Sequence, residues 1–109
     1  MSFRVEMTDG AHADLDRLMT WLEERSSPEA TDRLSARFHA ALDRLESRPF
    51  SCGLAYENRH FPEEVRHLLF EIRKGKPYRA LFIVRDDVVT ILCIRAPGEK
   101  PVKPNDVAL

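Results

Sequence analysis

The sequence has little cysteine and lacks any long apolar run. Its two cysteines, Cys52 and Cys93, are far apart in the chain and form no C-x-x-C pair, so we expect free thiols rather than a disulfide framework. No apolar run approaches the roughly 18 residues that span a membrane. The N-terminal residues also lack the charged start and apolar stretch of a signal peptide. These absences predict a cytoplasmic protein with no membrane partner.

The sequence also has little net charge, but its charges are unevenly distributed. The 109 residues carry a formal charge of −1. Residues 1–64 hold eight arginines and no lysine against thirteen acidic residues, whereas residues 65–109 hold nine basic and five acidic residues. The basic half could attract phosphates or an acidic peptide, and it is equally consistent with a solvated surface of uneven charge. The length and the 43% apolar content fit one globular domain.

The first part of the chain predicts one strand and two helices. Residues 2–7 alternate apolar and polar side chains, which is typical of a half-buried strand. Residues 11–25 and 28–47 each carry an apolar stripe at helical spacing, with Thr8 or Asp9 as the expected cap of the first helix. The stripes consist of Leu15, Leu18, Met19 and Leu22 in the first helix and of Ala30, Leu34, Phe38, Ala41 and Leu45 in the second. The short break between them predicts an antiparallel helical hairpin.

The second part predicts a loop, three strands and a tail. Residues 48–64 contain two prolines and no sustained period, which favours a long connecting loop. Three alternating runs follow within residues 67–73, 78–85 and 88–95, and the short breaks between them make the strands antiparallel neighbours. Both faces of the last two runs are apolar, so these strands should be central. Residues 97–109 contain three prolines and little apolar content, and we expect an extended, partly mobile tail.

The predicted fold is therefore α+β, with the order β-αα-βββ and a helical hairpin packed on a largely antiparallel four-stranded sheet. One domain spans residues 1–109, and residues 97–109 are its C-terminal tail. Several polar residues of the second part, His60, Glu63, Glu64 and His67, match no established zinc spacing. We therefore expect neither a metal nor another cofactor.

Four short motifs occur in an order that resembles a known family. They are C-x-L-A-x-E at residues 52–57, E-x-R-x-L-L-F at 64–70, Y-R-x-L-F-x-V at 78–84, and a strand that closes in Ile94-Arg95 before Pro97-Gly98. Together with the order of elements, they resemble the RelE/ParE superfamily of bacterial type II toxin–antitoxin toxins, in its ParE-like, plasmid-stabilisation branch. The similarity extends over nearly the whole chain.

The resemblance implies one of two activities. RelE-like members cut mRNA on the ribosome without a metal, using a cluster of Lys and Arg side chains and a C-terminal Tyr or His. The cations are needed because the scissile phosphate gains charge in the transition state. ParE-like members instead inhibit DNA gyrase by binding. An antitoxin protein neutralises both kinds and is the expected partner here.

This sequence departs from the nuclease pattern. Leu69, Phe70, Glu71 and Ile72 replace the paired lysines of the first meander strand, and no Tyr or His follows Tyr78. A carboxylate at Glu71 would also repel RNA, whose binding depends on cations. We therefore predict a growth-inhibiting, non-enzymatic toxin that acts on gyrase. A ribosome-dependent mRNA endonuclease and a degenerate, non-toxic member are the alternatives, and the sequence leaves a homodimer of the free chain open.

A small set of residues is expected to form the functional surface. The predicted contacts with the target or the antitoxin are Arg66, Arg79, Arg95, Tyr78 and Trp21. In the nuclease alternative, Arg66, Arg73 and Arg79 supply the cations, and Arg79 corresponds to the arginine of the family's Y-R motif. Each residue also has a structural interpretation. The arginines could pair with carboxylates at a sheet edge, Tyr78 could be a half-buried sheet residue, and Trp21 could pack on the helical hairpin.

Overall fold

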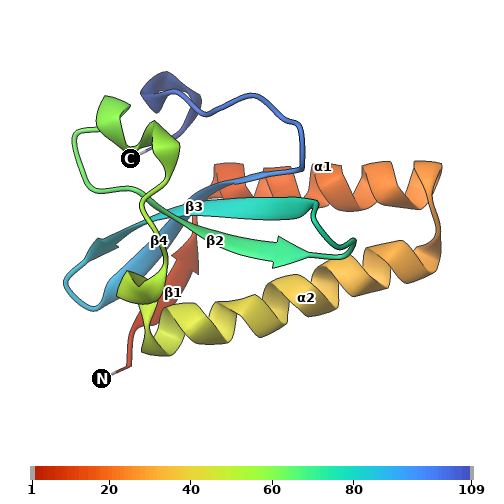
Figure 1. Ribbon diagram of the computed structural model, residues 1–109, viewed down its shortest axis with the longest axis horizontal. Coiled ribbons are helices and arrows are strands. Elements are labelled where there is room, and N and C mark those ends of the chain that lie inside the picture. Colours follow the sequence, from red (N-terminus) through yellow and green to blue (C-terminus); the bar gives the residue numbers. More distant parts are fainter. Residues whose placement is uncertain (1, 109) are drawn as a thin grey trace.

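The sheet in the computed structural model has the strand order β1-β4-β3-β2 (Figure 1). The structure describes residues 2–108, and the strands are β1 (Arg4–Met7), β2 (Arg66–Glu71), β3 (Pro77–Arg85) and β4 (Val88–Arg95). The last three strands pair antiparallel, and β1 lies parallel to β4. The predicted α+β fold with a largely antiparallel sheet is confirmed. β3 and β4 occupy the central positions that their two apolar faces predicted.

Both helices begin at side-chain caps. α1 (Asp9–Arg25) starts after Thr8, whose Oγ1 accepts the backbone N–H of Ala11 at 3.0 Å. α2 (Pro28–Ser47) starts after Ser27, whose Oγ accepts the backbone N–H of Ala30 at 3.2 Å. These bonds satisfy N–H groups that have no partner inside the helix. The predicted helical hairpin is therefore confirmed, and within residues 2–108 no helix is long and apolar enough to cross a membrane.

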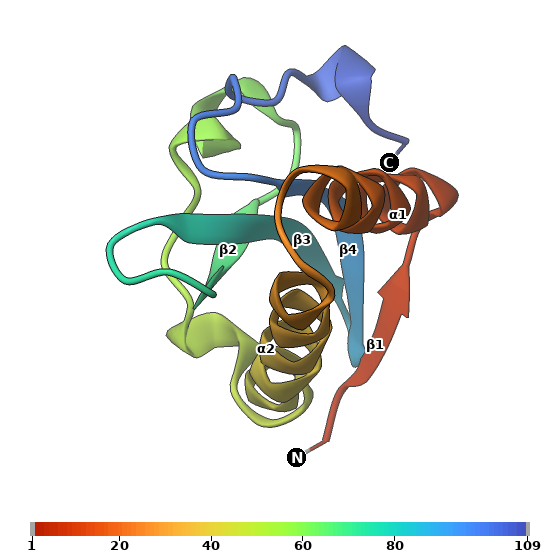
Figure 2. The ribbon, with the colours of Figure 1, turned by 90° about the vertical axis from the view of Figure 1, so that its right-hand side faces the viewer.

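The apolar stripes of both helices meet one face of the sheet, which we call the inner face (Figure 2). Phe38 of α2 lies 5.3 Å from Phe70 of β2, measured between ring centroids, and Phe70 stacks on Tyr78 of β3 at 5.6 Å. Burying a large apolar side chain of this kind contributes about 1.5–3 kcal/mol. This aromatic row therefore holds α2 against the β2–β3 hairpin.

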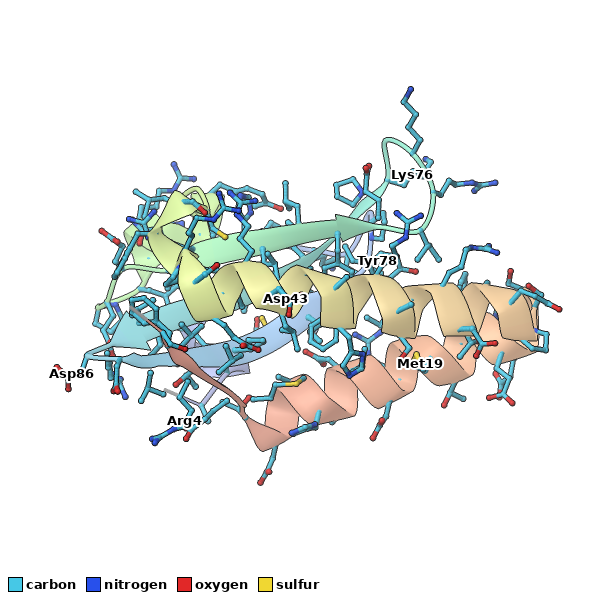
Figure 3. The ribbon with its side chains drawn as sticks, turned by 90° about the horizontal axis from the view of Figure 1, so that it is seen from below. Arg4, Met19, Asp43, Lys76, Tyr78 and Asp86 are labelled. Atoms are coloured by element: carbon cyan, nitrogen blue, oxygen red, sulfur yellow. The ribbon has the colours of Figure 1, made fainter. Side chains whose placement is uncertain are left out.

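Two strand turns lie at opposite ends of the molecule. The turn between β3 and β4 has the predicted two-residue length, and Asp86 adopts a φ of 54° within it. Aspartate tolerates this left-handed conformation better than most residues, which explains how the turn forms without glycine. Figure 3 shows Asp86 at one end and Lys76, in the turn between β2 and β3, at the other. The second turn is the one that borders the helical hairpin.

The segment between α2 and β2 is more ordered than the predicted connecting loop. It contains two short 3₁₀ helices, Pro49–Ser51 and Tyr56–His60. Leu54 also pairs with Arg66 in an isolated antiparallel bridge. No periodic signal is present in these residues, because single helical turns are too short to repeat an apolar stripe. The second part of this segment, with Ala55, Phe61 and Val65, packs on the outer face of the sheet, opposite the helices, whereas Cys52 belongs to the cluster on the inner face.

The C-terminal tail is anchored to the same outer face. Val102 is 2% exposed and belongs to a cluster with Leu81 and Ile83 of β3 and with Leu92 and Cys93 of β4. A short 3₁₀ helix, Pro104–Asp106, follows. Figures 1 and 2 show the tail beside the segment between α2 and β2. The tail is extended around its prolines, as predicted, but it lies on the sheet, where Val102 is buried and Val107 packs against the same cluster.

Candidate binding surfaces

Arg79 of β3 forms a bidentate ion pair with Glu57 on the outer face. Its Nη1 and Nη2 donate to Glu57 Oε1 and Oε2 at 2.8 and 2.7 Å. Glu57 Oε2 also accepts the backbone N–H of Val102 at 3.1 Å. Among residues 2–108, Glu57 is the one charged residue that is buried, at 2% exposure. One carboxylate thus joins the loop, the central strand β3 and the tail.

The Glu57 carboxyl ionises more readily than an ordinary glutamate. Burial opposes its ionisation, but hydrogen bonds from Arg79 and from the Val102 backbone outweigh burial and hold the pKa of Glu57 below its usual value. The same hydrogen bond to Glu57 raises the pKa of Arg79. Both groups therefore stay charged at physiological pH.

Acidification should weaken the fold through Glu57. Because the pKa of Glu57 is lower in the folded than in the unfolded chain, the carboxylate contributes stability that is complete above about pH 4.3, the ordinary glutamate value. This contribution is lost as the pH falls through the folded pKa. We expect the urea concentration at the midpoint of unfolding to decrease when the pH is lowered from about 6 to about 3. The decrease should be smaller in Glu57→Gln, whose side chain does not titrate. Parallel curves for the two proteins would contradict this role of Glu57.

Arg66, at the start of the edge strand β2, is also engaged within the chain. Its Nη1 donates to the Cys52 carbonyl oxygen at 2.6 Å, and its Nη2 donates to Glu64 Oε1 at 2.7 Å. The guanidinium carbon lies 5.4 Å from the ring centroid of Phe50, a residue that is 58% exposed. Arg66 therefore fastens the loop to β2 and leaves an exposed aromatic ring beside it.

Arg95 of β4 lies directly opposite Arg79 in the antiparallel register. Its Nη1 is 3.7 Å from Glu99 Oε2, and within the described part of the chain its buried Nε has no hydrogen-bond partner. Glu99 Oε1 accepts the backbone N–H of Ala96 at 2.8 Å and lies 3.4 Å from Arg17 Nη2. Glu99 thus fixes the turn after β4 and ties it to α1.

The other three predicted residues, Trp21, Arg73 and Tyr78, line a cleft of about 740 Å³. We call it the hairpin cleft, because residues of the α1–α2 turn and of the β2–β3 turn border it. Trp21 is 52% exposed there, and the Arg25 guanidinium carbon lies 5.6 Å from the Trp21 ring centroid. Tyr78 belongs to the floor of the cleft and is buried.

The Tyr78 hydroxyl is poorly suited to proton transfer. Burial, together with the negative charge of Glu99, raises the pKa of the Tyr78 phenol. Its side chain also lies on the inner face, in the cluster with the helices, whereas Arg79 belongs to the outer face. Successive side chains of a strand point to opposite faces of the sheet, so these two residues form no common site.

The outer face offers little for metal binding. Burial, and next the positive charge of Arg79, lower the pKa of His67, so its imidazole is neutral at pH 7. Within residues 2–108, no group of three or more His, Cys, Asp or Glu side chains is arranged to hold a metal ion. Cys52 and Cys93 are both buried and free.

The predicted residues thus lie in three places. Arg79 and Arg95 lie on the outer face, and Trp21, Arg73 and Tyr78 line the hairpin cleft. Arg66 lies at the edge of the sheet, opposite Phe82 of the inner cluster. Glu57 and Glu99 had no predicted role, although their carboxylates bind Arg79, Arg95 and Arg17. Glu57 is the last residue of the first of the four motifs, and this position could have identified it from the sequence as a residue with a specific role.

Comparisons with known proteins agree with this architecture. The family model described as "ParE toxin of type II toxin-antitoxin system, parDE" matches residues 5–100. A search of curated proteins finds no match. Among solved structures, a chain titled "Chromosomal ParDE TA system from P. aeruginosa" is similar, with a TM-score of 0.67 and 22% identity over 89% of this chain and 98% of that chain. The predicted resemblance is confirmed, and this chain belongs to the ParE toxin family of type II toxin–antitoxin systems.

Proposed function

We propose that this chain is a toxin that inhibits DNA gyrase by binding it, and that a cognate antitoxin neutralises it. The family match supports the role of this chain as a toxin. The similar structure is named as a ParDE toxin–antitoxin system, which supports an antitoxin as its partner. To inhibit gyrase, this chain would have to act in the cytoplasm. The proposed activity makes and breaks no covalent bond.

The observation that carries this proposal is the internal pairing of the sheet arginines. Metal-independent RNA cleavage needs cations free to approach a phosphate and a group that moves the 2′-hydroxyl proton. Arg79 is bound by both oxygens of Glu57, and Arg66 is bound by Glu64 and the Cys52 carbonyl. The pairing of both arginines favours inhibition by binding over cleavage.

Exposed apolar side chains beside these arginines support a protein target. Phe50 lies against Arg66 and Tyr56 against Arg79, while Leu54 and Leu69 are strand partners of Arg66 and Arg79. All four are between 48% and 58% exposed. Aromatic and arginine side chains are enriched where proteins bind one another, and charged residues fill the core of such contacts less often.

The purified chain should inhibit ATP-dependent supercoiling by gyrase and leave mRNA intact in a translating extract. Primer extension on the mRNA reads out the second activity in the same preparation. Cleavage of translated mRNA without gyrase inhibition would overturn the proposal in favour of the endonuclease. Induction with no effect on growth or on either assay would favour a non-toxic member.

A pair of variants locates the target surface. Tyr56→Ser combined with Leu69→Ser removes two exposed side chains from the outer face, and we expect inhibition to weaken about 10-fold or more, as for an interface hot spot. Trp21→Ser is the matched control, because it removes an equally exposed aromatic ring from the hairpin cleft. Equal losses from both changes would contradict an outer-face target site.

A further inference from the structure

A row of four arginines runs along one exposed side of α2. The four residues are Arg33, Arg37, Arg44 and Arg48, of which Arg48 is the cap at the end of the helix. At 3.6 residues per turn, they fall within about 60° of arc around the helix axis. The row is about 22 Å long, because each residue adds 1.5 Å along the axis. We call these four residues the arginine stripe.

The arginine stripe carries charge that the chain does not neutralise. All four residues are exposed, and within residues 2–108 none of them forms an ion pair. Arg44 donates from Nε to Ser51 Oγ at 2.9 Å and from Nη2 to the Ser51 carbonyl oxygen at 2.7 Å. These neutral acceptors orient the guanidinium and leave its charge in place. The stripe is thus a local excess of positive charge in a chain whose net charge is −1.

The acidic residues of α2 lie on a different side of the helix. Measured from Arg33, helical geometry places them about 40° to 140° away, in the direction opposite to the other arginines. They are Glu29, Asp32, Asp43 and Glu46. A helix side that is merely solvated usually carries charges of both signs. The separation of the two signs on α2 therefore favours a partner that carries many negative charges.

The arginine stripe lies on an open surface of the molecule. Figure 3 shows α2 in front of the sheet, and no other described element covers it there. Arg44 binds Ser51, in the segment that leads to β2, so the stripe lies on the β2 side of the helix. The side of an uncovered helix is convex, whereas sites for small ligands are concave. This shape favours a long polymer over a single small anion.

The side chains around the stripe favour a duplex phosphate backbone over other polyanions. Arginine binds phosphate oxygens through two parallel N–H donors. Among residues 2–108, the exposed large apolar residues are Trp21, Phe50, Leu54, Tyr56 and Leu69, and none of them belongs to α2. Membrane surfaces and partner proteins are bound through apolar anchors, and single-stranded nucleic acids are bound through stacked aromatic rings. Binding to the backbone of a duplex needs cations alone.

We propose that the arginine stripe binds the phosphate backbone of double-stranded DNA without reading its sequence. Its length of about 22 Å covers about six base-pair steps of 3.4 Å each, so the four guanidinium groups contact phosphates along one side of the duplex. Phosphate contacts provide affinity and position, and they carry no direct sequence information. The choice of DNA over an RNA duplex rests on the function proposed above, because gyrase acts on DNA. The phosphate chemistry of the stripe does not depend on that function.

The salt dependence of duplex binding tests the stripe. The probe is a fluorescein-labelled DNA duplex of about 20 base pairs, and fluorescence anisotropy follows its binding to the full chain. If four phosphates are neutralised, log K should fall with log salt at a slope of about −3.6, which means about a 100-fold loss between about 50 and 200 mM salt. Duplexes of two unrelated sequences should bind equally, and an RNA duplex should bind no more tightly than DNA.

A pair of double variants separates the stripe from the overall charge. Arg37→Gln with Arg48→Gln removes two phosphate contacts, so the slope should change to about −1.8 and the affinity at about 50 mM salt should fall about 10-fold or more. Arg59→Gln with Lys103→Gln is the control, because both residues are exposed, lie outside α2 and change the net charge equally. The control should keep the parent slope and an affinity within about 3-fold of the parent. Circular dichroism checks that both variants are folded.

Four results would overturn the proposal. They are no saturable anisotropy change at about 50 mM salt, equal losses of affinity in the two double variants, tighter binding of single-stranded DNA or of an RNA duplex, and competition by poly-glutamate as strong as by unlabelled duplex. The duplex is offered without gyrase, so these outcomes are separate from those of the proposed function. A chain that inhibits gyrase but fails these tests overturns the stripe alone. A chain that binds the duplex as expected but inhibits no gyrase overturns the proposed target alone.

Discussion

Replacing Glu57 by alanine should lower the free energy of unfolding by about 3–5 kcal/mol, the usual cost of removing one partner of a buried ion pair. The Arg79 side chain is only 11% exposed, so its guanidinium would lose two charge-assisted hydrogen bonds and gain little water in return. The Val102 N–H would lose its acceptor as well. Urea denaturation followed by circular dichroism measures the loss.

A surface pair provides the control for this prediction. Arg85 and Glu63 form a similar bidentate pair, but their side chains are 55% and 32% exposed. Glu63→Ala should therefore cost about 0–1 kcal/mol, as exposed ion pairs usually do. Equal losses of stability in Glu57→Ala and Glu63→Ala would show that burial does not determine how much an ion pair contributes to the stability of this fold.

A double variant separates the lost pair from the lost packing. Glu57→Met with Arg79→Met replaces both charges with unbranched apolar side chains, so no buried charge remains uncompensated. We expect this variant to recover most of the stability that Glu57→Ala loses, apart from about 1–3 kcal/mol for the unpaired Val102 N–H. A double variant as unstable as the single one would mean that Glu57 acts mainly through the tail.

Local periodicity explains which parts of the fold the sequence could predict. Leu18 and Leu22 lie one turn apart on α1, and apolar residues recur at every second position of the strands. The local pattern therefore predicted which face of each element is buried. The caps at Thr8 and Ser27 lie within three residues of the groups they bind. The parallel pairing of β1 with β4 had no such signal, since the strands are separated by most of the chain.

The organisation of the outer face depends on contacts that no local pattern encodes. Glu57 binds Arg79 across 22 residues and Val102 across 45 residues. Each of these residues taken alone is ordinary, because a glutamate in a loop and a valine among prolines usually face water or pack weakly. The arginines could therefore be identified as a group from the sequence. Whether their guanidinium groups are free or paired with carboxylates depends on the three-dimensional structure.

Displacing the tail should make Cys93 reactive. Burial, the largest influence, raises the pKa of the Cys93 thiol to about 12, so at pH 8 its thiolate fraction is about a thousandfold lower than that of a cysteine with an ordinary pKa. Val102→Asp places a carboxylate in the apolar cluster close to Glu57, which opposes docking of the tail. We expect alkylation of Cys93 at pH 8, followed by peptide mass spectrometry, to accelerate by about two to three orders of magnitude.

The second cysteine distinguishes local release from general unfolding. Cys52 is buried in the inner cluster with the helices, whereas Cys93 shares the outer cluster with Val102. Release of the tail alone should expose Cys93 and leave the rate at Cys52 unchanged, and Ala108→Asp, at an exposed position of the tail, should change neither rate. Acceleration at both cysteines would mean that Val102 stabilises the whole domain. No acceleration at either cysteine would mean that the Val102 side chain does not hold the tail on the sheet, and would leave that role to the hydrogen bond from the Val102 backbone N–H to the Glu57 carboxylate.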